Sequence, residues 1–211
     1  IRSGIEERER FLAAVSHDLK TPVTRLRLRS ELLADPLLRE RFVKDLDEMQ
    51  SLLSSALDFL HGKAVDEAIQ PLDLTALLES MVDDYADLGE EVLLQPQNLG
   101  QIFGRPQALR RAIGNLIDNG LKYGSKVSVE TVEDSGYLRI IIDDAGPGLP
   151  ASELERVFEP FYRMESSRSR ETGGVGLGLA IVRQIARGHG GDVLLENRSG
   201  GGLRAFLSLP L

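Results

Sequence analysis

Two helical stripes of apolar residues, separated by one short break, constrain the first third of this 211-residue chain most strongly. The first stripe alternates spacings of three and four, with Arg29 as its one misfit: Leu12, Val15, Leu19, Pro22, Leu26 and Leu33. After a break at Asp35 and Pro36, the second stripe runs over Leu46, Met49, Leu53, Leu57 and Leu60. Two helices joined by so short a turn must lie antiparallel. A lone hairpin leaves one side of each helix wet, so we expect a homodimer that forms a four-helix bundle.

A second, differently patterned region follows the hairpin. The segment "GKAVDEAIQP" loses helical periodicity, which is typical of a linker. We therefore predict a hairpin domain over residues 1–62, a linker over 63–70 and a second domain over 71–211. The second domain alternates predicted helices (74–88, 105–123 and 175–189) with the predicted strands "KVSVETV", "YLRIIIDD", "DVLLE" and "LRAFLSL". Their hairpin-like spacing predicts an α+β fold, with a mixed or antiparallel sheet and helices on one face.

Composition excludes several classes of function. The net charge of -8 disfavours a general electrostatic grip on nucleic acid, so we expect no nucleic-acid partner. The chain has no cysteine, which removes disulfides, zinc thiolate sites and thiol nucleophiles together. No apolar run approaches the ~20 residues that cross a bilayer, so we expect no membrane contact in this stretch. Because the chain begins at Ile1 and runs directly into a helical pattern, we expect a fragment of a longer protein.

Polar side chains share one stripe of the predicted helix over 105–123. In "NLIDNGLKY", Asn115, Asn119 and Lys122 fall on that stripe and Tyr123 lies at its margin. Amide oxygens can bind a hard cation that keeps most of its waters, and a lysine one turn on can hold phosphate. Taken alone, two asparagines on a helix are more often solvated or bonded to backbone.

A carboxylate and closely spaced glycines follow the strand "YLRIII". In "DDAGPGL", Asp144 can accept from an exocyclic amine, while Gly146 and Gly148 let the backbone turn tightly enough to admit a flat base. An ordinary turn is the alternative interpretation of this motif by itself.

A third motif, "GGVGLGLAIV", leads into a helix whose N-terminus can bind phosphate. It is not a dinucleotide fingerprint, because the polar segment "ESSRSRET" precedes it where a strand is required. Between the two glycine motifs, Phe158 and Phe161 are predicted to anchor a segment that carries Arg163, Arg168 and Arg170. Such a segment suits a lid over a triphosphate, with a plain surface loop as the alternative.

The motif "SHDLKTP" places a histidine on an exposed helical face. With Leu12 at heptad position a, His17 falls at f, and Lys20 and Thr21 lie beside it one turn on. Pro22 removes a helical hydrogen bond, so the turn that carries His17 is expected to bend or loosen. His61 and His189 are expected to have no particular role.

The order of these motifs resembles the sensor histidine kinases of two-component signalling, whose ATP-binding domain is related to gyrase B, Hsp90 and MutL. The "SHDLKTP" box resembles their phosphoacceptor box, close to the osmosensor branch because "TPVTRLRLRSELL" follows. The resemblance implies that His17 accepts the γ-phosphoryl group, that Asp18 is the base and that Thr21 orients a water for hydrolysis of the phosphorylated partner.

The same resemblance implies roles around ATP and Mg²⁺. Asn115 would bind Mg²⁺, with Asn119, Lys122 and Tyr123 on the phosphate side, and Asp144 would accept from the adenine amino group beside Gly146 and Gly148. Arg163 would reach the phosphates from the lid, and backbone of the last motif would surround them: Gly174, Val175, Gly176, Leu177, Gly178 and Leu179. Two residues depart from the family pattern. Val175 replaces a threonine or serine, and Gly120 replaces an alanine and weakens the helix slightly.

The resemblance thus predicts a histidine kinase that transfers its phosphoryl group to an aspartate of a response regulator and also acts as that regulator's phosphatase. It implies the cytoplasmic portion of an inner-membrane sensor kinase, with a membrane-anchored parent chain. A nucleotide-binding scaffold without turnover is the alternative from another class.

Overall fold

The structure is a computed structural model that describes residues 21–61, 67–95, 101–164 and 176–211. These residues fall into two compact units, a helical hairpin and an α/β unit. Four predicted site residues lie outside the described ranges: His17, Asp18, Gly174 and Val175. None of the helices in those ranges is both long and apolar enough to cross a membrane.

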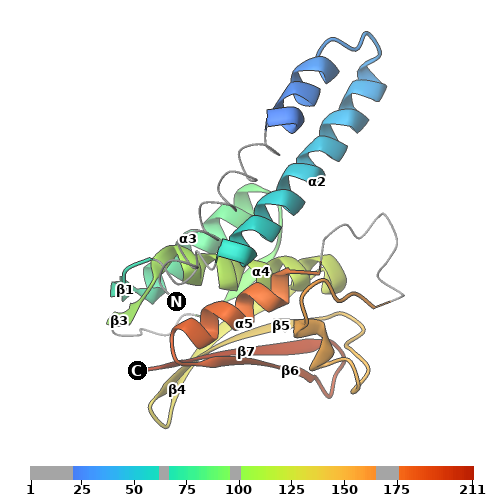
Figure 1. The fold of residues 1–211 in the computed structure, drawn as a ribbon. Coiled ribbons are helices and arrows are strands. Elements are labelled where there is room, and N and C mark those ends of the chain that lie inside the picture. Colours follow the sequence, from blue (N-terminus) through green and yellow to red (C-terminus); the bar gives the residue numbers. More distant parts are fainter. Residues whose placement is uncertain (1–20, 62–66, 96–100, 165–175) are drawn as a thin grey trace. The chain divides into compact units, whose positions relative to one another are not determined.

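The first unit is an antiparallel helical hairpin, as predicted (Figure 1). Residues 21–30 are helical, and after a short turn α2 runs over Pro36–His61. Asp35 caps α2, since its Oδ1 accepts from the backbone N–H groups of Leu37 (2.9 Å) and Leu38 (3.2 Å). Pro36 follows at the first helical position, where its missing N–H costs nothing. The aspartate and proline that break the apolar stripes therefore end one helix and start the next.

The helix over residues 21–30 buries a different face from the one that the heptad pattern predicts, whereas on α2 the predicted seam residue Leu46 is buried. Val23 and Ser30 are buried, whereas Leu26 of the predicted seam is 46% exposed and Arg29 is also exposed. Val23 and Ser30 each follow a predicted seam position by one residue, and one residue turns a helix by about 100°. The seam prediction is thus wrong for the first helix within one hairpin but is confirmed at Leu46 of α2, and Leu26 stays on an apolar face that the single chain leaves open.

The second unit contains a five-stranded mixed sheet with helices on one face (Figure 1). The strand order is β2-β4-β5-β7-β6, in which β2 pairs parallel with β4 and the other neighbours pair antiparallel. The strands are β2 (Val92–Leu94), β4 (Val127–Asp134), β5 (Tyr137–Asp144), β6 (Asp192–Asn197) and β7 (Leu203–Pro210). The helices are α3 (Leu74–Asp87), α4 (Pro106–Gly124) and α5 (Gly178–Gly188). This arrangement confirms the predicted α+β class.

Alternate strand residues form the core beneath α4 and α5. On β5, Leu138, Ile140 and Ile142 are buried, and the same alternation recurs on β4 and β7. The apolar stripe predicted for α4 is buried throughout, which confirms it: Leu109, Ala112, Ile113, Leu116 and Ile117. Because this stripe faces the sheet, the polar stripe beside it lies at the edge of the helix layer.

Three short strands were not predicted. They are β2 of the five-stranded sheet and the two strands of a separate antiparallel pair, β1 (Gln70–Asp73) and β3 (Gln101–Gly104). Each has only three or four residues, too few for an alternating pattern to stand out. The β1 strand begins at Gln70, the last residue of the predicted linker, and Asp73 at its end caps α3 through a bond from the Ala76 N–H to Oδ1 (3.0 Å).

Candidate nucleotide-binding site

The start of α5 lies against the asparagines of α4. The Asn115 side-chain Nδ2 donates to the Gly178 carbonyl at 3.4 Å. A Cβ on Gly178 would lie 3.8 Å from Asn115 Oδ1 and 3.9 Å from Asn119 Nδ2. Both asparagines are half-buried. The structure therefore brings together two motifs that are 59 to 63 residues apart in sequence, and it aims the N-terminal end of a helix at a pair of amides.

The carboxylate of Asp144 is held by one of its two oxygens. Oδ1 accepts from the backbone N–H of Gly146 (2.8 Å) and from that of Leu203 (3.0 Å). Among the described contacts both bonds fall on Oδ1, so Oδ2 is the oxygen available to an incoming amine. Two fixed backbone donors orient the carboxylate before any ligand arrives, and this saves ordering entropy on binding.

The end of α4 touches the turn after Asp144. A Cβ on Gly124 would lie 2.8 Å from the backbone nitrogens of Ala145 and Gly146, and one on Gly146 would lie 2.8 Å from the Tyr123 carbonyl oxygen. Only residues without a side chain permit this approach. The helix that carries Asn115 and the turn that carries Asp144 are thus parts of one site.

The β6–β7 hairpin supports Asp144 from behind, which the sequence analysis missed. Arg198 Nη1 donates to the Asp144 carbonyl at 2.8 Å. The neighbouring Asp143 is buried and forms a two-point ion pair with Arg204, 2.7 Å at each contact, and a second pair with Arg198 at 3.3 Å. This hydrogen-bonded pairing raises the pKa of Arg204. The "RSGGGLR" segment, with a basic residue at each end, was the available sequence signal.

Phe158 anchors the segment before the glycine motif, but Phe161 does not. Phe158, at the end of the 3₁₀ turn η1 (Arg156–Phe158), is buried, whereas Phe161 is 58% exposed. Phe161 contributes its backbone instead, since its N–H donates to the Gly176 carbonyl at 3.0 Å. Phe161 and Gly176 have positive φ angles of 66° and 74°. Phe161 therefore adopts a backbone conformation that is costly for residues other than glycine. Here the chain closes the base of the predicted lid.

Arg163 lies next to Gly176 of the second glycine motif, and its contact with phosphate stays a prediction. A Cβ on Gly176 would lie 3.1 Å from Arg163 Cγ and 2.5 Å from the Tyr162 carbonyl oxygen. Leu177 is buried beside this contact, and Leu179 is half-buried in the first turn of α5. Arg168 and Arg170 lie outside the described residues.

Lys122 lies on the part of α4 that borders α3. Its Nζ is 5.2 Å from the centre of the exposed Tyr123 ring. Lys122 also lines an open groove between α3 and α4, together with Tyr85, Leu88, Glu90, Asp118 and Leu121. The phosphate contacts of Lys122 and Tyr123 therefore stay predictions.

His189 is a structural residue, which corrects the expectation that it has no role. Its Nε2 accepts from the Arg105 backbone N–H at 3.0 Å, and its Nδ1 lies 2.8 Å from the Ile185 carbonyl oxygen. These bonds require a neutral ring with the proton on Nδ1. Burial lowers the pKa of His189, and the positive charge of Arg105 lowers it further.

The described residues contain no cluster of three or more His, Cys, Asp or Glu side chains that could hold a metal ion. Magnesium needs no such cluster, because one amide oxygen, the substrate phosphates and water can together complete its coordination. Because Nδ2 of Asn115 is bonded to Gly178, Oδ1 is the atom that can serve as the protein ligand.

Two family models match the chain. Residues 7–61 match the His Kinase A (phospho-acceptor) domain. Residues 104–211, about half of the chain, match the histidine kinase-, DNA gyrase B- and HSP90-like ATPase. Fold and site together thus define an ATP-binding domain preceded by a phospho-acceptor domain.

Relatives and solved structures agree with these matches. The sensor histidine kinase GtrS of Pseudomonas aeruginosa is 44% identical over 207 residues, covering 98% of this chain and 42% of the relative. The signal transduction histidine-protein kinase/phosphatase MprB of Mycolicibacterium smegmatis is 33% identical over 224 residues, covering 96% and 45%. The crystal structure of the ATP binding domain of PrrB from Mycobacterium tuberculosis is 37% identical, with a TM-score of 0.56, and covers 67% of this chain and 96% of that one. The chain belongs to the histidine kinase-, DNA gyrase B- and HSP90-like ATPases, and among them to the sensor histidine kinases of two-component systems.

The chain spans less than half the length of these two curated relatives. The narrower assignment to an osmosensor-like branch stays a prediction.

Proposed function

We propose that this chain is the catalytic core of a histidine kinase that phosphorylates His17 with ATP and passes the phosphoryl group to an aspartate of a response regulator. One observation carries the proposal: the Gly178 end of α5, the Asn115 amide of α4 and the prepared carboxylate of Asp144 border one site. This combination suits a purine nucleotide, with its amino group at one end and its phosphates at the other.

Adenine recognition is assigned to Asp144 Oδ2. The exocyclic amine of adenine is a donor, whereas guanine carries a carbonyl oxygen at that ring position, which a carboxylate repels. Because Gly146 and Leu203 hold Oδ1, the carboxylate need not reorganise to receive the base. Gly148 continues the same wall.

The phosphates are assigned to the start of α5. Backbone N–H groups over residues 176–179 and the helix dipole favour an anion there, with Arg163 on the lid side and Asn119, Lys122 and Tyr123 on the α4 side. The family resemblance adds the backbone of Gly174 and Val175. When bound, Mg²⁺ would neutralise charge on the β- and γ-phosphates, with Asn115 Oδ1 as its protein ligand.

In the transfer step, Nε2 of His17 attacks the γ-phosphorus in line while the bond between that phosphorus and the bridging oxygen of ADP breaks. Asp18 accepts the Nδ1 proton, so the phosphorylated ring is left neutral. The phosphoryl group then moves from His17 to a regulator aspartate.

The test is incubation with ATP radiolabelled at the γ-phosphate. Wild type should acquire a label that acid removes and base does not, and His17→Gln should acquire none. Asn115→Ala and Asp144→Asn should abolish labelling with the fold intact by circular dichroism. Label that persists on His17→Gln would overturn the proposal, and nucleotide binding without labelling or ADP release would favour the scaffold alternative.

Phosphatase activity toward the regulator is assigned to Thr21, which is exposed on the helix over residues 21–30. A threonine hydroxyl there can orient water toward a phosphoaspartate. The relative MprB is named a kinase/phosphatase, which supports a dual role. Thr21→Ala should keep His17 labelling but slow loss of phosphate from the regulator.

A homodimer and a membrane-anchored parent chain complete the proposal. The hairpin exposes large apolar side chains that a second hairpin would cover, among them Leu26, Leu38 and Phe42. We assign the chain to the cytoplasmic part of an inner-membrane sensor kinase, over the predicted domains 1–62 and 71–211.

A further inference from the structure

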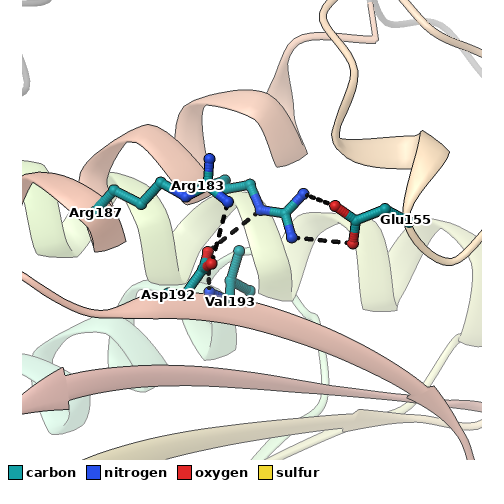
Figure 2. Close-up of polar contacts among 5 residues, drawn as sticks. All are labelled: Glu155, Arg183, Arg187, Asp192 and Val193. Atoms are coloured by element: carbon teal, nitrogen blue, oxygen red, sulfur yellow. Dashed lines mark hydrogen bonds and ion pairs between the residues drawn. The ribbon is translucent and has the colours of Figure 1, made fainter.

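Arg183 joins α5 to the segment that leads into the lid. Its guanidinium makes a two-point ion pair with Glu155, from Nη1 at 2.5 Å and from Nη2 at 3.0 Å (Figure 2). Its Nε donates to Asp192 Oδ1 at 3.2 Å, and its Cζ lies 4.2 Å from the centre of the Phe158 ring. The Arg183 guanidinium thus pairs through both Nη atoms, donates from Nε and stacks its flat face on an aromatic ring at the same time.

The contacts of Arg183 connect three parts of the α/β unit. Arg183 follows Gly178 by five residues on α5, and Asp192 begins β6. Glu155 and Phe158 belong to the short stretch that ends where Phe161 bonds to Gly176. We name residues 155–163 the lid stem. Arg183 therefore links the lid stem to α5 and to the start of β6.

Asp192 is itself fixed, so it anchors Arg183 rather than following it. Its Oδ1 accepts from the Val193 backbone N–H at 2.9 Å, and its Oδ2 accepts from Arg187 at 3.2 Å (Figure 2). The Arg183 side chain is only 14% exposed, whereas that of Glu155 is 73% exposed. Arg183 is thus a mostly buried cation, held by Asp192, that binds the exposed carboxylate of Glu155. The hydrogen bonds from Arg183 accordingly lower the pKa of Glu155.

We propose that Arg183 is a positioning residue for nucleotide binding, which fixes the lid stem against α5 so that Arg163 and Gly176 stay beside the Asn115–Gly178 contact. The inference rests on the proposed function, because it assumes that ATP occupies that contact. Loss of the Arg183 side chain would leave the adenine site around Asp144 formed, but it would let Arg163 and Gly176 move away from the phosphates. Removal of Arg183 should therefore raise KM for ATP and leave kcat at saturating ATP nearly unchanged.

Arginine is needed at this position rather than any cation. A lysine could pair with one oxygen of Glu155 or Asp192, but it lacks the fork and the flat face that stacks on Phe158. Arg183→Lys should consequently recover only part of the lost affinity.

The experiment measures KM and kcat for His17 autophosphorylation and the Kd for ATP, with melting temperature recorded for each variant. Arg183→Ala should raise KM and Kd about five- to twentyfold, and Arg183→Lys should fall between it and wild type. Glu155→Ala should raise both about threefold, in line with a charged pair that is exposed on one side. Arg187→Ala is the matched control, since it removes an arginine of the same helix that also pairs with Asp192 and that acts on Glu155 through its charge but has no described hydrogen bond or ion pair with the lid stem.

Glu155→Ala keeps the inference testable if Arg183→Ala fails to fold, because the Glu155 side chain is exposed and Arg183 keeps its ion pair with Asp192 when Glu155 is removed. Glu155→Ala with KM and Kd within 1.5-fold of wild type would overturn the inference, as would an equal rise in Arg187→Ala. Failure of wild type to bind ATP or to label His17 would instead overturn the proposed function.

Discussion

The side-chain amide of Asn197 is bonded at both ends to the backbone of Leu149. Its Oδ1 accepts from the Leu149 N–H at 2.8 Å, and its Nδ2 donates to the Leu149 carbonyl at 2.7 Å. Asn197 ends β6, whereas Leu149 follows the second glycine of the adenine turn. A paired amide thus joins the sheet to the turn, 48 residues away in sequence.

Asn197→Ala should loosen this turn. Loss of two net hydrogen bonds should lower the free energy of unfolding by about 2 kcal/mol. The affinity for ADP should fall as well, since the turn follows Asp144. Asn197→Asp keeps the acceptor but turns a carboxylate oxygen toward the Leu149 carbonyl oxygen, which it repels, so calorimetry should find it no more stable than Asn197→Ala. Wild-type ADP affinity in Asn197→Ala would show that the paired amide does not support the site.

Two glycines of α4 should respond to alanine in opposite directions. A Cβ on Gly114 would meet its nearest neighbours, Met81 and Tyr85, at ordinary distances of 3.7 and 3.8 Å. A Cβ on Gly120 would lie 2.7 Å from Cγ2 of Val127, a stiff and buried side chain. Alanine gains about 1 kcal/mol over glycine inside a helix, so Gly114→Ala should stabilise the chain.

Gly120→Ala should destabilise it by about 1 kcal/mol, because overpacking outweighs the same gain in propensity. Urea unfolding of both variants measures the difference. The departure from the family pattern at Gly120 would then reflect close packing of α4 on β4, and equal stabilisation of the two variants would refute this explanation.

Sequence patterns predicted the regular elements of the α/β unit and the site residues that lie within short motifs. The strand "YLRIIIDD" matches β5 to the residue, and the apolar stripe of α4 is buried at each predicted position. Asn115, Asp144 and Gly178 carry chemistry within short motifs, so their types and order could be read from sequence.

The residues that hold the site in place could not be predicted in this way. Arg198 and Leu203 bond to Asp144 across more than 50 residues, and Glu155 pairs with Arg183 across 28. Arginines and glutamates usually pattern as solvated surface, and only the packing of β6, β7 and α5 brings these together. His189 was missed for the same reason, because its partner Arg105 is 84 residues away.

Glu67 caps α4 from outside the helix, so Glu67→Ala should destabilise the α/β unit. Its two carboxylate oxygens accept from the backbone N–H groups of Gln107 (3.1 Å) and Ala108 (3.0 Å). Arg105 at the N-cap position makes no side-chain cap bond. The loss of a cap costs about 1 kcal/mol, and urea unfolding should detect it. Glu79→Ala, which removes an exposed acid from α3, should change stability by less than half as much.

The free energy of unfolding should decrease as the pH is lowered through the range where His189 titrates. Since burial lowers its folded-state pKa below the usual value of about 6.5, the unfolded chain binds the proton at higher pH than the folded chain does. The stabilisation is complete above the unfolded pKa and is lost as pH falls from there toward the folded pKa. The charged groups facing the ring are Arg105, which opposes protonation, and Glu67, which favours it.

Urea unfolding of wild type and His189→Gln between pH 7 and pH 5 isolates this effect. The lowered pKa values of Glu155 and Asp192 act in a more acidic range, below about pH 4.5. The loss of stability on acidification should be steeper in wild type than in His189→Gln. Parallel curves for the two proteins would exclude His189 as the source.

The exposed face of the hairpin should carry the dimer contact at Leu26 but not at Leu28. Both lie on the helix over residues 21–30, at 46% and 66% exposure. Leu26 belongs to the heptad seam, whereas Leu28 is two residues on, about 200° around the helix. A glutamate at Leu26 would carry a charge into the core of the proposed four-helix bundle, where its burial costs several kcal/mol. Sedimentation should find Leu26→Glu largely monomeric at concentrations where wild type and Leu28→Glu are dimers, and a dimeric Leu26→Glu would exclude this seam as the interface.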